Sequence, residues 1–170
     1  MSIWRTIADE AAGESQIWRD ALRPDGRREL EPVFSPLGAR EHALGLETIY
    51  EGYLVHYGRP RLFDPPDRDT ALLLGDYLYA HGLVRISSLG NTVAVNDLAE
   101  LISVCARMRG ECEPGDGVVW AATAAELGTG ALAGPRAVLR ATGDLRPLEA
   151  LVDGAADALA AHAERVSYAR

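Results

Sequence analysis

Lysine is absent from this sequence of 170 residues, and all of its 17 basic residues are arginines. The absence excludes a Schiff-base lysine and a lysine that grips a phosphate group. Cysteine is scarce as well: Cys105 and Cys112 are the two in the chain, which excludes a disulfide framework and predicts buried free thiols. The formal net charge is −8, so we expect no attraction to nucleic acid or to an anionic membrane.

Long apolar runs are also missing. The longest lie around residues 71–74 and 118–125, and both are far too short to span a bilayer. The first residues include acidic side chains and no apolar stretch of the kind found in signal peptides, so we expect a cytoplasmic protein without a transmembrane segment. The 48% apolar content and the length fit a single helical domain over residues 1–170 with a substantial core.

Strand signals are nearly absent, because alternating β-branched stretches do not occur and apolar residues recur at helical spacing. Glycine, proline and capping residues separate the periodic segments. Helices are predicted at about 2–22, 35–57, 69–88, 92–110, 116–128, 135–141 and 147–168. Gly154 should weaken the last helix but need not break it. The sequence therefore predicts an all-α fold, a single bundle of six or seven helices.

Three short motifs follow one another in the middle of the chain. They read Glu-Thr-Ile-Tyr-Glu at 47–51, His-Tyr-Gly-Arg-Pro at 56–60 and Gly-Asp-Tyr-Leu at 75–78. This order resembles the trans-type polyprenyl diphosphate synthases, in which a first Asp-rich motif is followed by an Arg-Arg-Gly-x-Pro turn and a Gly-Asp-x-Leu helix. The resemblance is strongest over residues 47–84 and weaker over 85–128, and it implies a truncated bundle like that of the isoprenoid synthases.

The resemblance also assigns candidate site residues. The family's Asp-rich motif binds magnesium ions that hold a diphosphate, so Glu47 and Glu51, which share one helix face, are the candidate ligands of a Mg²⁺ ion. The candidate contacts of a diphosphate are Arg28, His56 and Arg59. No other cofactor is implied.

Four further positions of these motifs are expected to be structural: Gly58, Pro60, Gly75 and Asp76. Asp76 lies in an apolar run of its helix, so we expect a buried carboxylate with a hydrogen-bond donor.

Each assignment has a simpler structural alternative. Glu47 and Glu51 could form a solvated acidic face or bind an arginine. Arg59 and Arg61 flank the proline of the turn and could contact a phosphate or be surface charges. Asp67 belongs to a cluster of acidic residues, for which the neighbouring prolines favour helix capping over metal binding.

The departures from the family pattern concern charge. The second Asp of the first motif is Thr48, the two arginines of the turn are His56 and Tyr57, and the family's Lys-Thr pair is Asp116-Gly117. No second Asp-rich motif is found after residue 128. The family reaction expels a diphosphate, whose charge needs several Mg²⁺ ions and cationic side chains. The sequence therefore argues against catalysis and assigns no catalytic residue; any activity that remained would be that of a prenyltransferase.

Three functional hypotheses follow, with a plain helical scaffold as the alternative to all of them. The leading one is a non-catalytic subunit or regulator of prenyl diphosphate biosynthesis, which forms a dimer or other homo-oligomer, or a hetero-oligomer with a catalytic polyprenyl diphosphate synthase. The second is a small Mg²⁺-dependent prenyltransferase or prenyl-diphosphate-binding protein. The third is a bundle that holds an apolar ligand between its helices.

Overall fold

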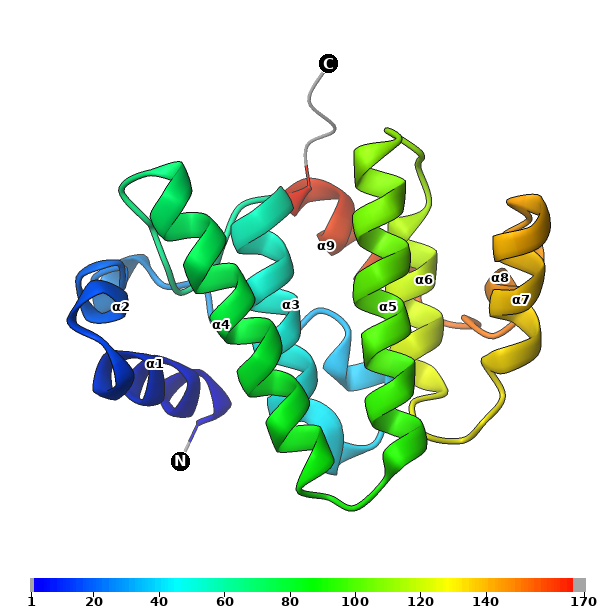
Figure 1. Cartoon of the computed structure of the whole chain (residues 1–170), viewed down its shortest axis with the longest axis horizontal. Coiled ribbons are helices and arrows are strands. Elements are labelled where there is room, and N and C mark those ends of the chain that lie inside the picture. Colours follow the sequence, from blue (N-terminus) through cyan, green and yellow to red (C-terminus); the bar gives the residue numbers. More distant parts are fainter. Residues whose placement is uncertain (1, 167–170) are drawn as a thin grey trace.

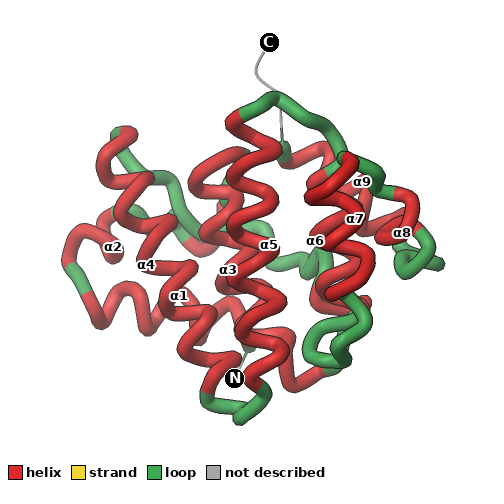
Figure 2. Tube along the Cα trace, turned by 45° about the vertical axis from the view of Figure 1, so that its right-hand side comes forward, coloured by secondary structure: helices red, strands yellow, loops and turns green. Residues whose placement is uncertain are grey.

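The computed structural model describes residues 2–166 and contains only helices and loops there, apart from an isolated β-bridge between Leu22 and Phe63 (Figures 1 and 2). The all-α prediction is confirmed. None of the helices in this described part is long and apolar enough to cross a membrane. The α-helices are α1 (Ile3–Glu14), α2 (Gln16–Asp20), α3 (Ala43–Tyr57), α4 (Arg68–Ser87), α5 (Thr92–Gly110), α6 (Asp116–Ala125), α7 (Ala133–Thr142), α8 (Arg146–Glu149) and α9 (Ala156–Arg165). The 3₁₀ turns are η1 (Asp25–Arg27), η2 (Ser35–Leu37) and η3 (Arg40–His42).

Two predicted helices are split in the structure. The first forms α1 and α2, because Ser15 is extended and its hydroxyl caps α2 by accepting a hydrogen bond from the amide of Ile17. The last forms α8 and α9, because Gly154 adopts a left-handed conformation with φ of +78°. The prediction of one continuous last helix is therefore wrong, because the chain does break at Gly154. Tyr168, its predicted end, lies outside the described residues.

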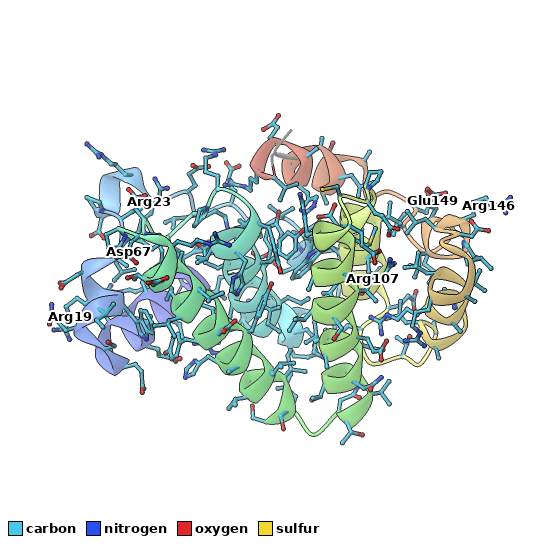
Figure 3. All side chains as sticks on the ribbon, turned by 45° about the horizontal axis from the view of Figure 1, so that its top comes forward. Arg19, Arg23, Asp67, Arg107, Arg146 and Glu149 are labelled. Atoms are coloured by element: carbon cyan, nitrogen blue, oxygen red, sulfur yellow. The ribbon has the colours of Figure 1, made fainter. Side chains whose placement is uncertain are left out.

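The other predicted helices are present with shifted ends, and α5 has the predicted bounds. α3 begins only at Ala43, since η2 and η3 occupy the start of the predicted helix. α4 is capped by Asp67, which accepts a hydrogen bond from the amide of Thr70 and lies at the N-terminal end of the helix (Figure 3). The preference for capping over metal binding at this aspartate is thus confirmed.

α3 lies between two apolar clusters. On one side, Trp4 and Ile7 of α1 pack with Leu74 and Leu78 of α4. On the other side, α3 packs with α5, α6 and α9 around Trp120, which is almost fully buried. Figure 1 shows this order, with α1 and α2 at one end of the molecule and α7 and α8 at the other. The motif-bearing helices α3 and α4 therefore form the middle of the fold.

Four glycines allow α3 and α4 to approach closely. A Cβ atom at Gly52 would lie 3.0 Å from the carbonyl oxygen of Gly75, and one at Gly82 would lie 3.1 Å from the carbonyl oxygen of Gly45. The two glycines of each helix are seven residues apart, so they recur on one face after about two turns. The antiparallel pair therefore packs nearly backbone to backbone at two levels.

A methyl group at Gly82 should force α3 and α4 apart, since it would collide with the Ile49 side chain. We expect Gly82→Ala to lower the free energy of unfolding by about 1–3 kcal/mol. Gly13 of α1 has no atom within 4 Å of an added Cβ, so Gly13→Ala should be neutral or stabilising by up to about 1 kcal/mol. Urea unfolding followed by circular dichroism measures both, and equal effects would contradict the close packing.

Candidate functional site

The acidic motif of α3 surrounds a buried arginine. Arg61 is 0% exposed, and its Nη1 lies 2.6 Å from Oε2 of Glu47 while its Nε lies 3.0 Å from Oε2 of Glu51. Its guanidinium also lies over the rings of Trp4 and Tyr50, at 4.5 and 5.0 Å from their centres. Arg61 is therefore no surface charge, and the carboxylates form no solvated face. The arginine-binding alternative describes the observed contacts.

All four oxygens of these two carboxylates accept hydrogen bonds. The second oxygen of Glu51 accepts from the amides of Arg61 and Leu62, at 2.8 and 2.7 Å. The second oxygen of Glu47 accepts from the amide of Ser35 at 3.2 Å. Burial lowers the pKa of Arg61, but the attraction of the two carboxylates outweighs it, so the pKa is raised overall and the guanidinium stays charged. A positive charge thus already lies where the resemblance expects a metal ion, and the Mg²⁺ assignment stays a prediction.

The His-Tyr-Gly-Arg-Pro turn at the end of α3 is joined to α9. The amide of Arg59 donates to the carbonyl oxygen of Arg165 at 2.9 Å, and a Cβ at Gly58 would lie 2.7 Å from that oxygen. Glu29 accepts hydrogen bonds from both side chains, at 2.7 Å from Arg59 and 2.8 Å from Arg165. Only glycine fits at position 58 without moving α9, which supports the structural role predicted for it. Pro60 is half-buried beside it, and its structural role stays a prediction.

The third motif meets the turn through His56. Nε2 of His56 lies 3.2 Å from a carboxylate oxygen of Asp76, and a Cβ at Gly75 would collide with the His56 ring. The Asp76 side chain is 67% exposed, so the expectation of a buried carboxylate is wrong: α4 turns this position outward. Burial lowers the pKa of His56 more than Asp76 raises it, which favours a neutral imidazole at neutral pH.

Arg28, the remaining candidate for diphosphate binding, has other partners. Its Nε donates to the carbonyl oxygen of Arg23 at 2.8 Å, and its Nη1 lies 2.7 Å from Asp25. The structure thus brings together His56 and Arg59 but not Arg28.

A second buried network was not predicted. Oδ2 of Asp116 accepts hydrogen bonds from the Tyr53 hydroxyl and from Nη2 of Arg109 (2.6 Å), and it lies 3.3 Å from Nε2 of His162. Nδ1 of His162 lies 2.9 Å from the Tyr50 hydroxyl. Burial is the main cause that raises the pKa of Tyr53 and Tyr50 far above the usual range, so both hydroxyls stay protonated. The signal in the sequence was Asp116 itself, an acidic residue where the resemblance expects a lysine. Tyr53 and His162 lie 63 and 46 residues from Asp116, too far along the chain for their approach to be predicted from spacing.

A cavity of about 830 Å³ opens where α3, α5 and α9 end, and we call it the terminal cavity. Its lining residues are His56, Tyr57, Gly58, Arg59, Ala106, Arg109, Gly110, Cys112, Pro114 and Arg165. Cys112 is exposed in a left-handed turn after α5, whereas Cys105 is buried, so the expectation of buried thiols is wrong for Cys112. Among residues 2–166, no cluster of three or more His, Cys, Asp or Glu side chains could hold a metal ion.

Arg61→Met should leave two buried carboxylates without their counter-charge. We expect the free energy of unfolding to fall by about 3–5 kcal/mol, measured by urea denaturation. The matched control is Arg140→Met, because Arg140 pairs with Glu100 on the surface and its side chain is 51% exposed. That change should cost less than about 1 kcal/mol. A similar loss in both variants would contradict the central role of Arg61.

Comparison with known proteins finds a curated relative. No protein-family model matches the chain, and no solved structure gives a significant match. Heptaprenyl diphosphate synthase component 2 of Geobacillus stearothermophilus is 35% identical over 130 residues, which cover 64% of this chain and 39% of that protein. The chain thus spans about two fifths of the length of this relative. The order of the motifs in α3 and α4 agrees with this similarity to a polyprenyl-synthase-related protein, which supports the resemblance to that family.

Proposed function

We propose that the chain is a non-catalytic subunit or regulator of prenyl diphosphate biosynthesis, which acts in the cytoplasm by associating with a catalytic polyprenyl diphosphate synthase. The observation that carries the proposal is the pairing of Glu47 and Glu51 with Arg61. A Mg²⁺ ion that binds these carboxylates would have to displace a buried guanidinium and the amide donors that share their oxygens. The acidic motif therefore serves the packing of this fold.

The outer surface of α4 supports the association. Leu73 and Val84 are 60% and 65% exposed, although α4 also supplies buried apolar residues to the core. They lie eleven residues apart, which is about three helical turns, so they share one face. Leu72, in the turn that contains Leu73, is 55% exposed. Exposed apolar side chains on one helix face are typical of a surface that another chain covers.

The curated relative supports the choice of partner. Its name describes it as component 2 of a heptaprenyl diphosphate synthase, and a numbered component implies an enzyme built from more than one part. This chain matches about two fifths of such a component, and its motif carboxylates bind an arginine. Both features fit an accessory part of the enzyme better than the catalytic part.

Charges on the α4 face should abolish the association. We expect the tagged chain to retain a polyprenyl diphosphate synthase in near-equal amount from the cytosol of its source. The double variant Leu73→Glu, Val84→Glu should lose this partner, because burying two carboxylates at an interface is costly. The measurement is affinity capture followed by mass spectrometry.

The matched control is Ile17→Glu with Val138→Glu, two exposed apolar positions on α2 and α7. This variant should retain the partner. If the unaltered chain were captured without any synthase, or were a monomer with no partner, the proposal would be wrong. Capture of a second copy alone would favour a homo-oligomer.

Magnesium discriminates this proposal from a Mg²⁺-dependent prenyltransferase or prenyl diphosphate binder. We expect millimolar MgCl₂, with or without a prenyl diphosphate, to leave the melting temperature unchanged relative to NaCl of equal ionic strength, because the oxygens of Glu47 and Glu51 are already bonded. A rise in melting temperature that required both Mg²⁺ and the diphosphate, and that Glu47→Gln with Glu51→Gln removed, would favour the enzyme.

A further inference from the structure

Two ion pairs join α5 to α7 at successive turns. Nη1 of Arg136 lies 2.8 Å from Oδ1 of Asp97, and Nη1 of Arg140 binds Oε2 of Glu100. The two acidic residues are three positions apart on α5 and the two arginines are four apart on α7, so each helix presents its two charges on one face. The first pair is buried, whereas the second is partly exposed. A polar contact therefore connects these helices from the core to the surface.

A small pocket lies at this contact, and we call it the α5–α7 pocket. All four charged side chains line it, together with residues that include Asn96 of α5. Its volume is about 160 Å³, which is room for about five water molecules at about 30 Å³ each. That space is too small for a prenyl chain, but it suits a polar molecule with a handful of non-hydrogen atoms.

Arg136 has an unused hydrogen-bond donor. The residue is 2% exposed, and its Nη2 donates to the carbonyl oxygen of Asp97 and to Oγ1 of Thr123, at 2.8 and 3.0 Å. Its Nε is buried and has no hydrogen-bond partner among residues 2–166. A buried charged donor without an acceptor is unfavourable. Because Arg136 lines the pocket, an acceptor oxygen held there would supply the missing hydrogen bond.

The charge of Arg136 is incompletely compensated. Burial lowers its pKa more than the attraction of Asp97 raises it. Asp97 also divides its own charge, since its Oδ2 accepts a hydrogen bond from the amide of Gly128 at 2.9 Å. A negatively charged oxygen therefore suits Nε of Arg136 better than a neutral one.

Glu100 supplies the opposite charge at the pocket. Its side chain is 35% exposed, and Oε2 is the oxygen that binds Arg140. Two carboxylates and two guanidinium groups line the pocket, so their formal charges cancel. A ligand that carried one charge of each sign would satisfy Arg136 and Glu100 together and leave no net charge in the pocket.

We propose that the α5–α7 pocket binds a small zwitterionic amino acid, with its carboxylate on Nε of Arg136 and on Arg140 and its ammonium group on Glu100. Amino acids with the smallest side chains match the volume. The site goes beyond the association proposed for α4 and does not require it, because its lining comes from α5, α7 and the loop before α7. An occupied pocket would connect α7 to α5 at a third point.

Equilibrium dialysis of the full chain with radiolabelled L-alanine measures occupancy. A melting temperature would be a poor readout, because osmolytes such as free amino acids stabilise folded proteins by exclusion from their surface. We expect saturable binding of one alanine per chain. Acetate and ethylammonium carry one charge each, so they should compete only at concentrations about tenfold higher or more. L-Phenylalanine should not compete, since its side chain exceeds the pocket.

Variants locate the binding. Arg140→Met and Glu100→Gln should each weaken alanine binding about tenfold, since each removes a charged contact. Ala133→Trp should fill the pocket, which Ala133 lines, and abolish binding. Arg107→Met is the matched control, because Arg107 pairs with Glu111 in the last turn of α5, where Figure 3 labels it, and its side chain is 39% exposed. Near-ultraviolet circular dichroism confirms that each variant is folded.

Three results would overturn the site. Absence of saturable binding by the folded chain up to tens of millimolar alanine would leave a pocket that holds water only. Competition by acetate as strong as that by unlabelled alanine would remove the role of Glu100. Binding unchanged in Arg140→Met and Ala133→Trp would mean that alanine binds elsewhere. Capture of the synthase by Ala133→Trp tests the association separately, so failure of one proposal is distinguishable from failure of the other.

Discussion

The fold depends on one buried ionic contact. Arg61 draws together α1 through Trp4, α3 through Glu47 and Glu51, and the segment before η2 through the carbonyl oxygen of Glu31. The two carboxylates carry one more negative charge than the single guanidinium neutralises, and all three groups are buried away from water. Backbone amides that also donate hydrogen bonds to the carboxylate oxygens stabilise this extra charge. The chain segments that supply those amides are therefore fixed in place by the same contact. An apolar core tolerates changes of shape more easily than such a cluster tolerates the loss of one member.

The same residues show a second use for an acidic pair of this spacing. Glutamates one helical turn apart present two carboxylates on one face, and such a face binds a magnesium ion or an arginine with similar geometry. In this chain the arginine comes from just beyond the motif turn, so the turn and the acidic motif depend on each other. Asp116 is a second buried carboxylate of this kind, and it binds Arg109 and Tyr53 in the other core region. Both acidic positions hold the bundle together from inside.

Local patterns predicted the helices and the motif positions well, and long-range contacts poorly. The bounds of α5 and the cap at Asp67 follow from neighbouring residues, and so does the order of the three motifs. The break at Gly154 was missed because a glycine in a periodic segment permits both a helix and a left-handed turn, and packing decides between them. Binding of an arginine by Glu47 and Glu51 was one of the alternatives, but spacing did not identify Arg61 as that arginine. The approach of His162 to Asp116 could not be predicted, since 46 residues separate the two and no periodicity relates them. The exposure of Asp76 depends on which face α4 turns to α3, which the glycines at their contact determine.

The contact between α9 and the motif turn has a consequence for how the chain matures. Arg165 bonds Glu29, which lies 136 residues earlier, and its carbonyl oxygen holds the amide of Arg59. Contacts of such sequence separation form late, because a long loop must close before they contribute. On the ribosome, α3 and α4 can pair soon after they emerge, but the turn between them acquires its final neighbours only once α9 has been synthesised. The surroundings of Cys112 are thus completed at the end of folding, and a chain interrupted before α9 would carry the motifs without the cavity.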